Sequence, residues 1–160
     1  MSGKSEGGGK EHIKLVAQNR KARFDYHVES KVECGIVLRG TEVKSLRAGS
    51  AQLSDAYAMG KHGELWLHNV QIAPYQPAGP LANHEPKRAR KLLLHKREID
   101  RIAEQQQKAG YTLIPLSIYF KDGRVKVELG VCKGKTGTDK RDSIAEREAK
   151  REMDRAKRIK

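Results

Sequence analysis

A segment near the end of the chain has the residue types of a phosphate-binding loop. It reads Gly130-Val-Cys-Lys-Gly-Lys-Thr136 and follows the strand-like run 124–129. In nucleotide hydrolases the spacing G-x-x-x-x-G-K-[ST] lets backbone N–H groups surround the phosphates. Here the first glycine would have to be residue 129, which is leucine, and residues 137–160 contain no further strand that could carry a Mg²⁺-binding aspartate. We therefore predict that this segment is not a nucleotide-binding loop, and a phosphate-using enzyme stays only as an alternative.

Other groups that could do chemistry are few and scattered. Cys34 and Cys132 lie far apart without a C-x-x-C motif or a Cys/His cluster, which predicts two reduced, half-buried cytoplasmic thiols and no zinc site. None of the six histidines has a spacing relative to a serine or carboxylate that suggests a catalytic pair. We expect no catalytic residues, no metal and no cofactor, and so a protein that is not an enzyme.

The charge of the chain favours a polyanionic partner. Its 160 residues hold 33 Lys and Arg against 20 Asp and Glu, a net charge of +13. Such a surplus makes nucleic acid the first candidate partner and an anionic membrane the second. No apolar run approaches the roughly 20 residues that span a bilayer, so we expect no membrane association. Residues 1–12 have no apolar core and are predicted to be a disordered lead.

The pattern of apolar residues predicts a mainly β structure. Residues 31–38 are strand-like, and two hairpins are predicted at 56–73 and 112–131, the second turning at Lys-Asp-Gly. Helices are predicted from Thr41 to a stop at Gly49 and over 95–109. Residues 74–91, with four prolines, are predicted to be an exposed loop without helix or central strand. One barrel, residues 13–132, is expected: an OB-fold-like closed β-barrel with two or three short helices.

The remaining residues, 133–160, form a basic tail. It is glycine-rich at first and then helix-prone, with a capping box at Ser143-x-x-Glu146 where a helix could start. Its apolar stripe, from Ala145 to Ala156, is too slight to dock firmly on a barrel. We expect the tail to be disordered when free and to become helical on an anionic surface, and the alternative is a solvated tail with no task.

Three residues in the first third of the chain suggest contacts with unpaired bases. Phe24 and Tyr26 alternate with cations in Arg-Lys-Ala-Arg-Phe-Asp-Tyr, a composition that suits stacking on bases. Glu33 lies in a strand of a basic protein, where a carboxylate would repel phosphate. Either it forms a salt bridge with a neighbouring cation, or it accepts hydrogen bonds from base amino or imino groups.

Taken in order, several segments resemble the bacterial tmRNA-binding protein family, also called SsrA-binding protein or small protein B. They are Asn19–Arg23, Glu33–Gly35, Gly40–Gly49, Pro86–Leu94, Val131–Lys135 and Asp139–Arg141, and the resemblance covers nearly all of the chain after residue 12. It implies an OB-type barrel that binds the tRNA-like domain of tmRNA, and a complex that enters stalled ribosomes for trans-translation. The tail would then become helical in the decoding region and the empty mRNA channel.

The resemblance and the charge pattern together give two sets of expected contact residues in a protein that acts as a monomer with its RNA. The RNA-binding set is Asn19, Lys21, Arg23, Phe24, Tyr26, Glu33, Lys44, Arg47, Arg88, Arg90 and Lys91. The set in the ribosome-binding tail is Lys133, Gly134, Lys135, Asp139, Lys140, Arg141 and Ile144.

Two departures from the family pattern and one rival function remain. Phe24 stands where many relatives have histidine, so stacking would replace any hydrogen bond of that histidine, and Ala149 stands where tails often carry tryptophan. The rival is a general single-strand-binding barrel or ribosomal accessory protein, which would bind unrelated RNAs with similar affinity.

Overall fold

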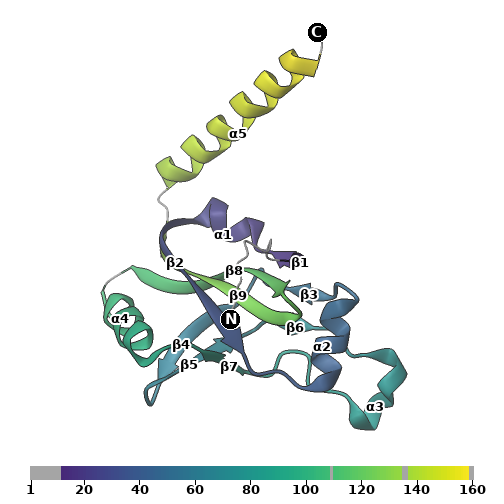
Figure 1. Cartoon of the computed structure of the whole chain (residues 1–160). Helices are drawn as coiled ribbons and strands as arrows, with labels where there is room; N and C mark the ends of the chain where they lie inside the picture. The colour runs from purple at the N-terminus through teal and green to yellow at the C-terminus, as the bar shows by residue number, and fades with distance from the viewer. Residues whose placement is uncertain (1–11, 109, 135–136, 159–160) are drawn as a thin grey trace, which may run out of the picture.

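A computed structural model describes residues 12–108, 110–134 and 137–158 of the chain (Figure 1). Residues 1–11 of the predicted disordered lead lie outside the described part. The described chain forms a β-barrel with helices around it and one long helix that projects away from the barrel (Figure 1).

The barrel is a seven-stranded antiparallel sheet in the order β1-β8-β4-β5-β7-β2-β9, and pairing between β8 and β9 closes it. The strands are β1 (Ile13–Gln18), β2 (Tyr26–Ile36), β4 (Tyr57–Lys61), β5 (Glu64–His68), β7 (Arg90–Leu93), β8 (Tyr111–Lys121) and β9 (Arg124–Gly134). A second sheet pairs β3 (Ala51–Gln52) with β6 (Gln71–Ile72). The predicted mainly β, closed OB-like barrel is confirmed.

The two helices predicted within the barrel are present. They are α2 (Gly40–Arg47), followed by Gly49 at a φ of 83°, and α4 (Lys96–Gln106). A positive φ costs glycine little, so Gly49 ends α2 as predicted. A reciprocal capping box between His95 and Glu98 fixes the start of α4. In Figure 1, α4 and α2 lie on opposite sides of the barrel.

The proline-rich segment corrects the sequence prediction. It contains the 3₁₀ turn η2 (Gln76–Ala78) and the short helix α3 (Gly79–Ala82), and residues 90–93 form β7 inside the barrel. Pro77 and Pro80 each lie in a first helical turn, where the N–H that proline lacks has no intrahelical acceptor. The prediction of a loop without helix or central strand was wrong, because a proline in the first turn of a helix does not break it.

A bulge in β8 divides the predicted apolar face of the last hairpin. The register of β8 against β9 shifts between Pro115 and Ser117. Residues after the bulge, such as Ile118, enter the main core, whereas Ile114 and Leu116 enter a second cluster with Ala22 and Cys132. An extra residue in one strand moves the alternation to the other face. The short helix α1 (Arg20–Asp25) packs on the second cluster through Ala22. This helix was not predicted from the sequence.

The tail contains a helix, α5 (Gly137–Arg158), which begins six residues before Ser143. It extends away from the barrel above α1 (Figure 1). Whether the helix persists in the free protein stays a prediction. No helix in the described ranges is both long enough and apolar enough to cross a membrane.

Candidate nucleic-acid interface

Asn19 fixes the start of α1. Its Oδ1 accepts a hydrogen bond from the Ala22 N–H at 3.0 Å, and its Nδ2 donates to the carbonyl oxygens of Leu53 at 3.0 Å and Pro115 at 3.1 Å. The residue is 4% exposed. An amide with both N–H groups engaged and its oxygen capping a helix serves mainly to place α1. Asn19 therefore affects ligand binding indirectly, because it positions the side chains of α1.

A hollow of about 320 Å³ lies between α1, which Asn19 positions, and β4. Lys21 lies on its rim, 4.0 Å from Asp55, and both side chains are largely exposed. Tyr26 and Tyr57 line the hollow. An exposed ion pair of this kind is weak, so Lys21 can exchange Asp55 for a phosphate at little cost.

A larger cleft of about 740 Å³ lies between α1 and α5. The Arg147 guanidinium carbon is 5.7 Å from the centroid of the Phe24 ring, a cation–π contact that joins the two helices. Among the described residues that line the cleft, six are cations and none is a carboxylate: Arg20, Lys21, Arg23, Arg147, Lys150 and Arg151. This concentration of positive charge can hold several phosphates. The cleft also brings four predicted RNA-binding residues, Asn19, Lys21, Arg23 and Phe24, next to the tail.

Glu33 lies in a separate part of the barrel wall. The Tyr119 hydroxyl donates to its Oε2 at 2.5 Å, and the Lys121 ammonium lies 3.3 Å from Oε1. The hydrogen bond from Tyr119, followed by the Lys121 contacts, holds the pKa of Glu33 below its usual value despite opposing desolvation. The side chain stays 38% exposed. The ion pair matches the salt-bridge alternative, and the exposed, ionised carboxylate also keeps the capacity to accept from a base.

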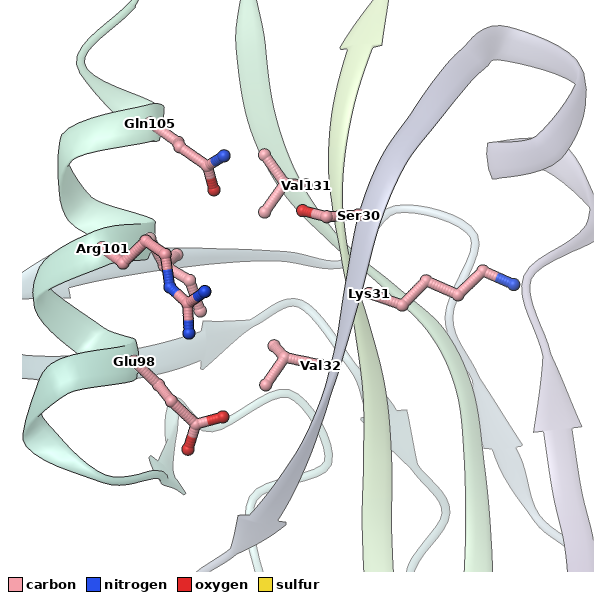
Figure 2. Close-up of a pocket in the computed structure, with 8 residues that line it drawn as sticks. Ser30, Lys31, Val32, Glu98, Arg101, Gln105 and Val131 are labelled. Atoms are coloured by element: carbon pink, nitrogen blue, oxygen red, sulfur yellow. The ribbon is translucent and has the colours of Figure 1, made fainter.

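Figure 2 shows how the β2 side chains next to Glu33 in the sequence are oriented. Ser30 and Val32 point toward α4, into a small pocket of about 180 Å³ with Glu98 and Arg101, whereas Lys31 points away (Figure 2). Side chains alternate along a strand, so Glu33 shares the outer face with Lys31.

An exposed leucine adjoins this outer face and was missed from the sequence. Leu93 of β7 pairs with Gly35 of β2 and is 49% exposed, whereas Leu92 is buried. The run Leu92-Leu93-Leu94 lies at a strand end, and alternation requires one of two adjacent leucines in a strand to face outward. That signal was present in the sequence.

Arg88 and Arg90 were expected on the RNA-binding surface, but Arg90 is buried, and Arg88 is only 22% exposed and paired with an internal carboxylate. Arg90 is 0% exposed, and its Nε donates at 2.5 Å to Oε2 of Glu42, which is itself 0% exposed. The other Arg90 nitrogens donate to the carbonyls of Val70 at 2.8 Å and Pro86 at 3.0 Å. Arg88 pairs with the other oxygen of Glu42. These guanidiniums anchor α2 to β7, so we remove both from the expected interface.

The other expected cations lie on different elements. Lys91 of β7 pairs with Glu64 of β5 on the outside of the barrel. Lys44 of α2 lies 5.5 Å from the centroid of the Tyr75 ring, and Arg47 is exposed in the last turn of the same helix. The α2 pair lies apart from the α1 hollow and remains a proposed second contact.

The expected tail residues begin inside the barrel. Lys133 and Gly134 are the last residues of β9, and the Lys133 ammonium lies 5.9 Å from the centroid of the Tyr111 ring. Residues 130–133 pair as extended strand with both β2 and β8, and Gly134 pairs with β2, which is not the geometry of a phosphate loop. Arg141 and Ile144 are exposed on α5. Lys135 lies outside the described residues, as do the side chains of Asp139 and Lys140, whose backbone belongs to α5.

The described thiols are poor nucleophiles. Burial raises the pKa of Cys34 to about 12 and that of Cys132 to about 11. A thiol that stays protonated at neutral pH neither attacks an electrophile nor binds a metal readily. Within the part of the chain that the structure describes, no three metal-ligating side chains gather at one point.

Comparison with known proteins identifies the family of this chain. The family model described as SmpB protein matches residues 16–159. The chain belongs to the SmpB protein family. Among SmpB relatives, the SsrA-binding protein of Thermobifida fusca (strain YX) is 58% identical over 143 residues, 89% of each chain. That of Myxococcus xanthus (strain DK1622) is 55% identical over 157 residues, 98% of this chain and 96% of the relative.

A solved SmpB structure has the same fold. It is described as "tmRNA-SmpB: a journey to the center of the bacterial ribosome" and superposes with a TM-score of 0.66 at 46% identity, covering 80% of this chain and 93% of the other. The family resemblance expected from the sequence is therefore confirmed.

Proposed function

We propose that this protein binds the tRNA-like domain of tmRNA and delivers it to stalled ribosomes for trans-translation. The observation that carries the proposal is the family match over residues 16–159, together with relatives named as SsrA-binding proteins and a neighbour studied with tmRNA and the ribosome. The cation-lined cleft beside α1 supplies the charge that such a partner requires.

The work is divided between two parts of the chain. The barrel, expected over residues 13–132 and extended by β9 to Gly134, binds tmRNA through the α1 hollow and the outer face around Glu33. The part of the predicted tail that follows Gly134 lies along the empty mRNA channel and reaches the decoding region as a helix. Both parts act in the cytoplasm by binding, and neither makes or breaks a covalent bond.

A truncation tests this division. Because Gly134 pairs with Tyr26 at the end of the barrel, the cut is best placed after Gly134, so that β9 stays complete. The truncated protein should bind the isolated tRNA-like domain nearly as tightly as the full chain, and peptide tagging on stalled ribosomes should be lost. A fall in RNA affinity as severe as the loss of tagging would contradict the two-part division.

Substitution of Glu33 tests whether its carboxylate reads a base. Glu33→Arg should weaken binding of the tRNA-like domain although it adds positive charge, because a base donor loses its acceptor. A gain in affinity would show that Glu33 is only an ion-pair partner of Lys121. Competition between tmRNA and an unrelated tRNA separates the proposed function from a general RNA-binding barrel, which would bind both equally.

A further inference from the structure

The outer surface of the β4–β5 hairpin carries a row of large side chains. Leu65 and Leu67 of β5 are buried in the core, so the alternate residues point outward. Two cross-strand pairs on this outer side are Tyr57 with His68 and Met59 with Trp66. Met59 is 47% exposed, and Trp66 is the only tryptophan in the chain.

These side chains form the floor of a shallow depression of about 600 Å³. Met59, Trp66 and His68 line it, together with Lys61 at the end of β4 and His62 in the turn between β4 and β5. The only carboxylate that lines it, Glu64, is paired with Lys91. The depression thus has a flat aromatic and thioether floor and a cationic edge.

A stacked pair of rings links the depression to the α1 hollow. The rings of Tyr57 and His68 stack with centroids 5.3 Å apart and planes inclined by 19°. Tyr57 also lines the hollow with Lys21 and Tyr26, and His68 lines the depression with Trp66. Ring-bearing side chains therefore run from the candidate RNA interface around the barrel to Trp66.

We propose that this surface binds an unpaired nucleotide, whose base stacks on Trp66 and Met59 while Lys61 contacts its phosphate. Stacking on an aromatic ring beside a cation is the usual way in which barrels hold single-stranded nucleic acid. A protein segment fits the surface less well, because it would bury Lys61 and the Glu64–Lys91 pair away from water. The proposal depends on the proposed function only for the identity of the RNA to which the nucleotide belongs.

Trp66 itself reports on the contact. Its fluorescence is followed while the full-length protein is titrated at low salt with hexa-adenylate, and separately with an abasic oligonucleotide of the same length and charge. Anisotropy of the labelled oligonucleotides measures binding in parallel. Hexa-adenylate should quench the emission as it binds, and the abasic strand should bind without quenching.

Three variants identify the residue responsible. Trp66→Ala should bind labelled hexa-adenylate roughly tenfold more weakly, Trp66→Phe should stay near the native affinity, and Leu81→Ala removes an exposed side chain elsewhere as the matched control. The phenylalanine variant separates a lost stack from a lost fold.

Several results would overturn the proposal. They are equal quenching by both strands, no binding or no quenching with hexa-adenylate, and a Trp66→Ala affinity equal to that of Leu81→Ala. An emission change with an apolar helical peptide alone would assign the surface to a protein partner instead. Binding of the tRNA-like domain, measured on the same variants and on Glu33→Arg, shows separately whether the proposed function stands.

Discussion

Lys21 and Arg90 are cations that the sequence suggested for the same task, and the fold gives them opposite surroundings. Lys21 is exposed beside Asp55, at the edge of a cleft lined by six cations. Arg90, the first residue of β7, is buried, with Glu42 of α2 and two backbone carbonyls as acceptors. One cation is held loosely and can be shared with a ligand, and the other is committed to the fold.

The difference shows that the cations of a basic cluster fall into two groups. Those with acceptors inside the protein stabilise the fold, and the others can bind a ligand. Arg88 and Arg90 satisfy Glu42, whose carboxylate would otherwise be a buried, unpaired charge, and removal of one partner of such a set is costly. Desolvation raises the pKa of Glu42, but hydrogen bonds from Arg88, the Arg39 N–H and Arg90 outweigh it, and the net pKa is lowered. Lys21, beside α1, is held by an exposed contact with Asp55, so its charge remains available to a polyanion.

The largest expected effect follows from removing the carboxylate of Glu42, which pairs with Arg88 and Arg90. Glu42→Gln leaves two guanidiniums facing a neutral amide in the core, and should lower the free energy of unfolding by roughly 3–5 kcal/mol. Urea denaturation at neutral pH measures it. Glu64→Gln is the matched control, because Glu64 also pairs with a lysine but on the surface, and it should cost about 1 kcal/mol or less. Equal losses in the two variants would contradict the assignment of Arg88 and Arg90 to the core.

A smaller effect is expected on the exposed side. Lys21→Ala should leave unfolding unchanged within about 0.5 kcal/mol. It should weaken binding of the tRNA-like domain severalfold and reduce the slope of log affinity against log salt by about one, as the loss of one phosphate contact requires. Binding measured at several salt concentrations gives both values. An unchanged slope would place Lys21 outside the interface.

The sequence carried much of the fold because its strongest signals are local. The alternation in the last hairpin and the glycine after α2 each act within a few residues. The bulge at Pro115 could not be predicted, since it depends on how β8 meets β9 around a closed barrel. The burial of Arg90 could not be predicted either, because Glu42 lies 48 residues away along the chain. The outward orientation of Trp66 and Leu93, by contrast, could have been predicted from the alternation of side chains along a strand.

The smallest effect concerns Glu33, which lies between the two extremes because it is paired and yet partly exposed. Its pKa in the folded protein is below the ordinary value of 4.5, so its charge stabilises the fold above that pH. The contribution is lost as the pH falls through the lowered pKa. Glu33→Gln should therefore be less stable than the native protein at pH 7, by under about 1 kcal/mol, and the gap should close as the pH falls below about 4.5.

Urea denaturation at pH 7 and at two acid values measures this gap. Glu85→Gln, at an exposed glutamate before β7, controls for the loss of any carboxylate and should show almost no gap at any pH. A gap that widens in acid would mean that burial outweighs the Tyr119 and Lys121 contacts, and Glu33 would then belong with the committed residues of the core. A gap that closes leaves an ionised acceptor at neutral pH, which is the state that recognition of a base amino group needs.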